Sequence, residues 1–352
     1  MITPATLFVV SGFHSIYNET GVLSVDISNA TNANYFAYFI PLNDTGNYVN
    51  ANNESQSFNG ARSILTRLST ASASLGQILP ITPPFNDCSY PLNFSAPYVN
   101  CTTANSTVEY LIDAFLHEMN STWEESGLAF IEAYYAFVPS YDADVDNANT
   151  ILYNGINYTA LDMPRLQEQP MNATNELWMK FYRYSTDSNG NPVVVPNYSV
   201  CSLWNASYEL EFSFENGAQT VRNNSIRLLN PVDYPVNDPN EPSDLVQLAY
   251  SALFMVLTDQ LVGYMGIFTN STTLTPQYGS INTNIEHNSV LGSDDLDYFF
   301  FLNSQVTNSN DTILSPQRLS DKALAQNETL PFLVQQLSFN VTVSLMNDPL
   351  LA

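Results

Sequence analysis

The chain has 352 residues, a hydrophobic fraction of 45% and a formal net charge of −25, from 9 basic and 34 acidic side chains. The hydrophobic fraction is that of a globular protein and excludes a disordered tail. The scarcity of Lys and Arg excludes a nucleic-acid-binding surface and argues against direct docking on anionic lipid, because both need clustered positive charge. The acidity is typical of a soluble, self-repelling protein in an acidic extracytoplasmic setting.

The first third of the chain predicts strands, loops and short helices. Val22–Ile27 and Tyr35–Ile40 have strand-like patterns. Residues 63–79 predict either a short helix or a packed small-residue segment. Residues 107–119 place apolar side chains on one helical face, and residues 128–138 predict an aromatic strand that closes at Pro139.

The clearest β pattern lies between Leu177 and Leu229. Tyr208, Leu210, Phe212 and Phe214 alternate with polar residues, which predicts a strand with one buried face. Two Asn-Gly pairs, at 189–190 and 216–217, predict hairpin turns at the ends of these strands.

The longest apolar run of the chain follows a Pro-rich, acidic connector. It predicts a helix over about residues 243–266 that is buried on most of its circumference, with a narrow polar stripe through Asp244, Gln247, Ser251 and Thr258. Only 14 residues separate Asp244 from Asp259. A membrane span needs about 20 apolar residues, so the run favours a core helix.

The C-terminal part predicts a helix around residues 331–337, followed by a strand-like segment, FNVTVSL, at residues 339–345. The predicted fold class is therefore α+β: an antiparallel β-rich domain with one long buried helix, about 243–266, and a few shorter helices. The length fits one large domain spanning residues 1–352, and a division into two lobes, about 1–160 and 161–352, stays open.

The most specific signal is the density of Asn-X-Ser/Thr sequons, the acceptor motif for N-linked glycans. Because sequons must face solvent to be modified, their spread along the chain predicts an N-glycosylated lumenal or extracellular protein. The seventeen sequons begin at Asn18, Asn29, Asn43, Asn53, Asn93, Asn100, Asn105, Asn120, Asn157, Asn172, Asn197, Asn205, Asn223, Asn270, Asn310, Asn327 and Asn340.

Three cysteines agree with an oxidising compartment. Cys88 and Cys101 flank a Pro- and Asn-rich stretch and predict a disulfide that closes a short ring. Cys201 is then the odd cysteine: it is buried and reduced, pairs outside this chain, or takes Cys88 or Cys101 as its partner. The first residues lack the basic start of a signal peptide, so we expect both ends to belong to a longer protein.

Candidate chemistry is sparse. His117 to Ser121 begins like the zinc-protease motif HExxH, but Ser121 stands where the second histidine is required. Asp142, Asp144 and Asp146 resemble the start of a calcium loop without its glycine or its final glutamate, which leaves a loose calcium site or an exposed acidic loop.

Three groups of acidic residues are candidates for the acid and base of a glycoside hydrolase, a reaction that needs two carboxyl groups at a set separation. The groups are Glu124 with Glu125, Glu209 with Glu211, and Asp294, Asp295 and Asp297. No serine-hydrolase elbow and no phosphate-binding Gly-rich loop is found in the sequence, so we name no catalytic residue.

Four features together resemble the large ectodomain of uncharacterised fungal membrane glycoproteins, some of which are labelled formylmethionine deformylase-like. They are Asp87-Cys88, the stretch Pro97–Thr102, the stretch Cys201–Tyr208 and the apolar run from residue 243. The resemblance implies an extracytoplasmic domain tethered by membrane helices that lie outside this chain. A deformylase would need the complete HExxH, so no catalytic residue is carried over.

The leading interpretation is a heavily glycosylated extracellular or cell-surface domain without catalytic activity, which acts in structure, adhesion or assembly. Its expected partners are other copies of itself or cell-wall and cell-surface components, and N-linked glycans are its only expected attached group. A carbohydrate-active hydrolase and a receptor-like binder of a glycan or small ligand are the alternatives.

Overall fold

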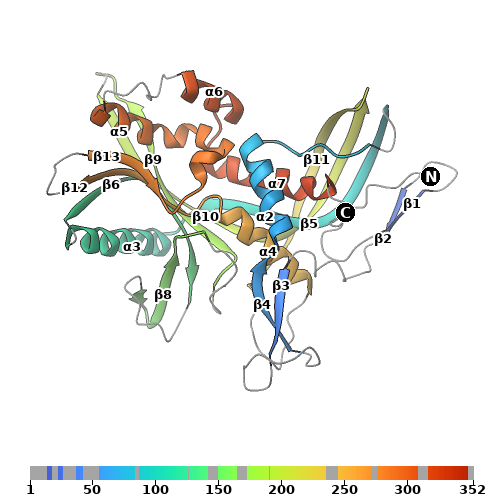
Figure 1. Cartoon of the computed structure of the whole chain (residues 1–352), viewed down its shortest axis with the longest axis horizontal. Coiled ribbons are helices and arrows are strands. Elements are labelled where there is room, and N and C mark those ends of the chain that lie inside the picture. The colour runs from blue at the N-terminus through green and yellow to red at the C-terminus, as the bar shows by residue number, and fades with distance from the viewer. Residues whose placement is uncertain are drawn as a thin grey trace.

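The computed structural model describes residues 14–17, 23–26, 37–42, 55–83, 87–125, 127–141, 150–164, 173–189, 191–234, 245–270, 276–307 and 316–347. A large antiparallel sheet of nine strands dominates these residues, and helices pack on its faces (Figure 1). The predicted α+β, antiparallel β-rich fold class is confirmed.

Strand β10, Pro192–Glu215, is the spine of the sheet. One of its edges pairs with β5, Cys88–Thr103. Its other edge pairs first with β9, Glu176–Thr186, and then with β11, Ala218–Pro231. The spine therefore changes partner halfway along, and the sheet forks at that point.

The remaining strands extend from β9. The sheet continues through β6 (Leu128–Ser140), β12 (Gly263–Asn270) and β13 (Pro276–Ile281), and the end of β6 also pairs with β8 (Ile156–Leu161), which pairs with β7 (Thr150–Tyr153). Two separate pairs are formed by β1 (His14–Tyr17) with β2 (Leu23–Asp26) and by β3 (Ala37–Leu42) with β4 (Ser55–Ala61). The division considered at residue 160 does not follow the sheet, because β5 and β6 pair directly with strands from the second half.

The predicted alternation in β10 is confirmed, with Tyr208, Leu210 and Phe212 each fully buried. Nearer the start of the strand the buried positions are Cys201 and Leu203, which are odd-numbered. The parity changes between Leu203 and Ala206, and β5 changes parity at the facing positions, where Val99 and Ala96 are both buried.

The helices cover both faces of the sheet unequally. Those of the main core are α2 (Ser63–Leu75), α4 (Leu245–Thr258), α5 (Asp297–Thr307), α6 (Pro316–Ala325) and α7 (Leu330–Ser344), joined by short 3₁₀ turns at Ile285–His287, Ser289–Gly292, Asp294–Leu296 and Leu345–Asn347. Helix α3, Ser106–Glu125, packs a second core against the opposite face of β6, β9 and β12 (Figure 1).

The predicted central helix is buried but shorter than expected. Helix α4 ends at Thr258 rather than near residue 266, and the chain enters strand β12 at Gly263. Gly263 has φ of 111°, and a Cβ there would lie 2.5 Å from the carbonyl oxygen of Asn282. Only glycine fits this backbone, so the entry into β12 requires glycine at that residue.

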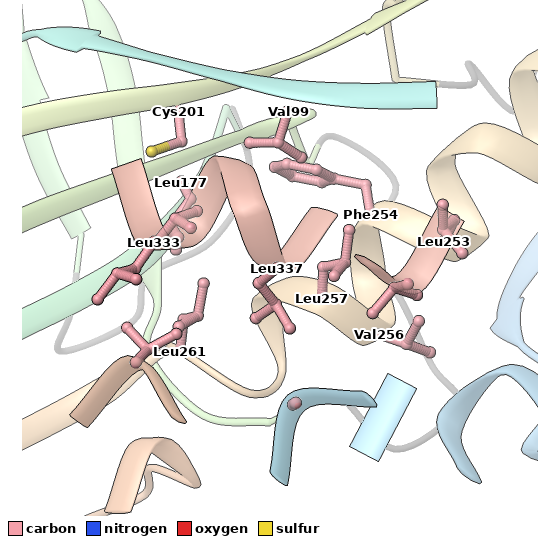
Figure 2. Packing of buried hydrophobic residues seen from close by; sticks show 14 of the residues in the cluster. Val99, Leu177, Cys201, Leu253, Phe254, Val256, Leu257, Leu261, Leu333 and Leu337 are labelled. Atoms are coloured by element: carbon pink, nitrogen blue, oxygen red, sulfur yellow. The ribbon is translucent and has the colours of Figure 1, made fainter. Parts of the chain in front are cut away.

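Helix α4 forms the middle of the main core. Figure 2 shows Phe254 and Leu257 of α4 beside Leu337 of α7 and Val99 of β5. None of these four side chains is more than 3% exposed. Burying a side chain of this size contributes about 1.5–3 kcal/mol, so the facing surfaces of α4 and α7 hold the helical layer on the sheet.

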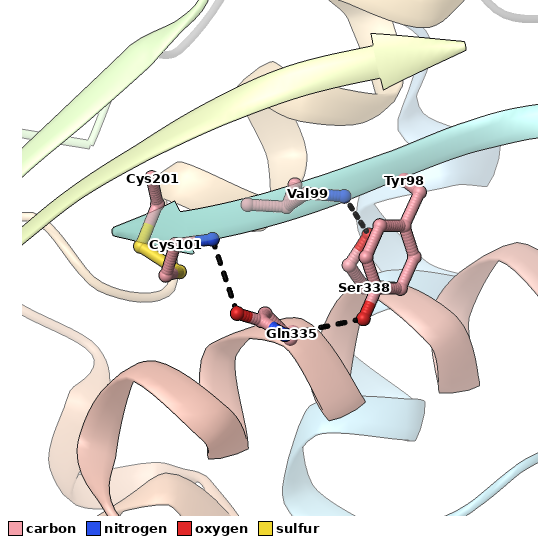
Figure 3. Close-up of a disulfide and its surroundings, with 6 residues drawn as sticks. All are labelled: Tyr98, Val99, Cys101, Cys201, Gln335 and Ser338. Carbon is pink, nitrogen blue, oxygen red and sulfur yellow. Dashed lines mark hydrogen bonds between the residues drawn. A yellow bond between two sulfur atoms is a disulfide. The ribbon is translucent and has the colours of Figure 1, made fainter. Parts of the chain in front are cut away.

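Helix α7 covers the outer edge of β5 with polar side chains (Figure 3). Backbone N–H groups of Cys101 and Val99 donate to Gln335 Oε1 and Ser338 Oγ at 3.1 and 3.0 Å. Thr342 Oγ1 donates to the carbonyl oxygen of Pro97 at 3.1 Å. Side chains spaced three and four residues apart on α7 thus reach every second residue of β5. Their hydrogen bonds occupy backbone groups on the free edge of β5, which could otherwise pair with another strand.

The strand expected at residues 339–345 is wrong, because α7 continues through Ser344. The Val and Thr residues of this segment favour strand locally. Packing decides otherwise: Val341 and Val343 enter the main core, and Thr342 bonds the β5 edge. Tertiary contacts outweigh an intrinsic preference of a few tenths of a kcal/mol per residue.

Candidate functional site

The described disulfide joins Cys101 to Cys201, which are 100 residues apart in sequence. The predicted Cys88–Cys101 ring is wrong, and the alternative in which Cys201 takes Cys101 holds (Figure 3). Cys88 and Cys101 lie near opposite ends of the extended strand β5, roughly 40 Å apart at about 3.3 Å per residue. Cys101 and Cys201, in contrast, are directly opposed in the β5–β10 ladder.

A cleft of about 480 Å³ lies at the fork of the sheet, where β10 changes partner from β9 to β11. Ser202 still pairs with Glu176 of β9, whereas Trp204 already pairs with Pro231 of β11. The two partner strands diverge between these residues, which opens the cleft. Its volume is within the range of small-ligand sites, about 300–1,000 Å³.

Asn175, which lines the cleft, forms hydrogen bonds to the segment after β11 and to helix α4. Its amide nitrogen donates to the carbonyl oxygen of Val232 at 3.0 Å and to Ser251 Oγ of α4 at 2.9 Å. The side chain is 5% exposed, and within the described part of the chain its amide oxygen accepts no hydrogen bond. A buried acceptor without a donor costs about 1–3 kcal/mol, so an unsatisfied Oδ1 of Asn175 is unusual for a residue with a structural role alone.

Aromatic and acidic side chains line the cleft together. Tyr141, Trp204 and Tyr234 contribute rings, and Glu176 and Asp233 contribute carboxylates. Trp178 Nε1 donates to Glu176 Oε2 at 2.8 Å and so fixes that carboxylate. Burial, with smaller contributions from the charges of Glu176 and Tyr158, raises the pKa of Tyr141 to about 12, so its hydroxyl stays protonated at neutral pH.

A second polar group surrounds Lys180, whose side chain is 9% exposed. Its Nζ lies 2.9 Å from Asp113 Oδ1 of α3 and 3.3 Å from Glu132 Oε1 of β6. The hydroxyls of Tyr198 and Tyr182 donate to the same two carboxylates at 2.9 and 2.6 Å. Burial first, and then the bond to Glu132, raises the pKa of Tyr182. Lys180 thus forms ion pairs with both carboxylates, and its pair with Asp113 connects α3 to the sheet.

The acidic residues at 294–297 also serve the fold. Asp295 accepts from Arg183 Nη2 and from the backbone N–H of Leu330, both at 2.9 Å, and so caps the start of α7. Asp297 pairs with Arg318, which is fully buried, at 2.7 Å. Lys322 bridges Asp294 and Asp297 at 2.8 and 2.5 Å.

The other predicted chemical groups stay apart from the cleft. Glu209 accepts from Ser225 Oγ at 3.0 Å on the solvent-facing side of the sheet, and Glu211 lies 3.9 Å from Arg222. Glu124 and Glu125 are exposed at the end of α3. In the same helix Ser121 Oγ donates to the carbonyl oxygen of His117 at 2.9 Å, as a helical residue rather than a metal ligand.

The calcium candidates Asp142, Asp144 and Asp146 lie outside the described residues. Within the described ranges, no group of three or more His, Cys, Asp or Glu side chains is arranged to hold a metal ion.

Ten of the seventeen sequon asparagines have described side chains. Asn93, Asn105, Asn223 and Asn327 are exposed, and Asn100, Asn120, Asn157, Asn197 and Asn205 are partly buried. Asn105 Oδ1 accepts from the backbone N–H groups of Thr107 and Val108, both at 3.0 Å, so this residue caps α3. The side chains of Asn18, Asn29, Asn43, Asn53, Asn172, Asn270 and Asn310 lie outside the described set.

Asn340 is the one sequon asparagine that is buried among the ten with described side chains. It is 6% exposed within α7, and its amide nitrogen donates to the carbonyl oxygen of Gly76 at 3.2 Å. A glycan attached to that nitrogen would disrupt the hydrogen bond to Gly76, so we expect Asn340 to be unmodified. The sequon is a motif of three consecutive residues, so it cannot show that this turn of α7 packs against the end of α2.

Among the described helices, none combines the length and the apolar character that a membrane crossing requires. Comparisons with protein-family models, with curated proteins and with solved structures found no match for this chain.

Sequence reasoning missed the cleft at the fork. Tyr141, Glu176 and Trp204 are far apart in sequence and belong to no short motif. The only local signal was the polar residue Asn175, two positions before the strongly β-like run that begins at Leu177.

Proposed function

We propose that this chain is an N-glycosylated extracytoplasmic domain without catalytic activity, which acts in structure, adhesion or assembly at a cell surface. The observation that carries the proposal is the chemistry of the solvent-facing side of β5, β10 and β11. There the sequon residue Asn93 lies opposite Glu209, which lies opposite Ser225, and all three side chains are exposed.

This polar side, which we call the glycan face, is defined by Asn93, Glu209, Glu211 and Ser225. The reverse side of the same strands carries the buried aromatic residues of the main core. An antiparallel sheet tolerates water on one face, and a glycan on Asn93 would shield that face from other sheets.

Two further observations support the proposal. The Cys101–Cys201 disulfide is typical of oxidising compartments. The acidic residues at 294–297 are committed to ion pairs and to the cap of α7, which removes one of the three candidate groups for the hydrolase alternative.

The test is a site-by-site glycan map of protein purified from its native source. Enzymatic release of the glycans in heavy-oxygen water, followed by peptide mass spectrometry, marks each occupied asparagine. We expect occupancy at Asn93, Asn105, Asn223 and Asn327 and none at Asn340. Unmodified asparagines at all four exposed positions would refute the extracytoplasmic assignment.

The assembly role has its own test. Sedimentation velocity of the glycosylated protein over a range of concentrations, alone and with isolated cell-wall particles, measures self-association and wall binding directly. A monomer that binds neither itself nor wall material would overturn this part of the proposal.

A further inference from the structure

The cleft at the fork combines aromatic rings and carboxylates in a way that the glycosylated-scaffold function does not require. Tyr141, Trp204 and Tyr234 present π-systems, and Glu176 and Asp233 present negative charge. No Lys, Arg or His is among the described residues that line it. Aromatic faces and carboxylates both attract cations, and neither favours an anion.

Within the described part of the chain, no basic side chain neutralises the carboxylates of the cleft. Glu176 is held by the indole N–H of Trp178, a neutral donor. Among the described residues, no basic group lies within ion-pair distance of Glu176 or Asp233. By comparison, the buried carboxylate of Asp295 and the partly buried carboxylate of Asp297 are each paired with an arginine.

The cleft also holds an unused acceptor. The amide nitrogen of Asn175 is committed to Val232 and Ser251, which leaves its buried oxygen without a donor in the described structure. Together with the two carboxylates, this makes a wall rich in acceptors. Such a wall suits a ligand that brings N–H donors as well as charge.

The net charge of the whole chain also favours a cationic ligand. A net charge of −25 raises the local concentration of cations around a cleft of the same sign. The volume of about 480 Å³ is too large for a bare metal ion and fits a small organic molecule.

We propose that the cleft formed by Tyr141, Glu176, Trp204, Asp233 and Tyr234 binds a small organic ammonium ion, with the ammonium group between the carboxylates and its apolar part against the rings. This site is additional to the scaffold role and does not depend on the glycans. It corresponds to the third role considered from the sequence, a receptor-like binder of a small ligand, and specifies the chemistry of that ligand.

The test compares three probes of similar shape by isothermal titration calorimetry at low salt: benzylammonium, benzyltrimethylammonium and neutral benzyl alcohol. We expect saturable binding of benzylammonium, with benzyl alcohol at least about tenfold weaker. The affinity should fall as salt is added and should be the same for enzymatically deglycosylated protein.

Variants locate the site. Glu176→Gln keeps an acceptor for the Trp178 indole but removes the charge, and Asp233→Asn removes the exposed charge. Each should weaken benzylammonium about five- to tenfold. Glu215→Gln makes the same change of charge at the exposed β10–β11 turn and should change the affinity less than about twofold. Unchanged melting temperatures confirm that the variants are folded.

Several results would overturn the proposal. They are no benzylammonium binding up to about 10 mM, equal binding of benzyl alcohol, equal loss of affinity in Glu215→Gln, or binding of a neutral saccharide without binding of any ammonium probe.

Discussion

The double variant Cys101→Ala, Cys201→Ala tests how much the disulfide between β5 and β10 stabilises the fold. The disulfide closes a loop with a sequence separation of 100 residues. In the chain-entropy model, a crosslink of this length stabilises the folded state by about 4.7 kcal/mol, because it restricts the unfolded chain. Globular proteins are stable by only about 5–15 kcal/mol, so the double variant should lie close to its unfolding limit.

The assay is urea unfolding followed by far-ultraviolet circular dichroism, with Cys88→Ala as the matched control. Cys88 is partly buried beside the main core but lies outside the described disulfide. Its replacement should cost only about 1 kcal/mol, the value of a small apolar contact. The double variant should show a much lower urea midpoint with a similar slope.

Peptide mapping without reduction gives an independent measurement on the native protein. We expect one crosslinked peptide pair that contains Cys101 and Cys201. A crosslink between Cys88 and Cys101 would refute the argument from strand geometry. An equal loss of stability in Cys88→Ala and in the double variant would refute it as well.

Three further predictions concern single side chains. Ser338→Ala removes the acceptor for the backbone N–H of Val99 and should lower the free energy of unfolding by about 1–3 kcal/mol; an unchanged urea midpoint would contradict this. Burial raises the pKa of Asp162 to about 6, above its usual value near 4, so the folded state binds the proton more tightly and stability falls as pH rises through this window. Asp162→Asn should therefore flatten the profile of urea midpoint against pH between about 4 and 6; an unaltered slope would argue against the assignment. Asn93→Gln should increase the mobility of the glycoprotein on a denaturing gel, whereas Asn340→Gln should not; a shift in the second variant would show that Asn340 is modified.

The local pattern of the sequence determined the elements whose structure depends on neighbouring residues. The alternation through Tyr208 to Phe214 predicted which face of β10 is buried, because side chains of a strand point to opposite sides in turn. The Asn216-Gly217 pair predicted the β10–β11 hairpin, and both residues have positive φ, at 52° and 78°. The apolar run from residue 245 predicted a buried helix for the same local reason.

Only the tertiary structure decided features that depend on residues distant in the chain. Helix α4 stops at Thr258 because the residues from Gly263 pair with β6, more than 100 positions earlier. The segment at 339–345 is helical because the edge of β5 takes up its polar side chains. Cys101 pairs with Cys201, Asn340 is buried and the acidic cleft forms at the fork for one physical reason: each depends on which strands and helices become neighbours, and periodicity within a segment does not record its neighbours.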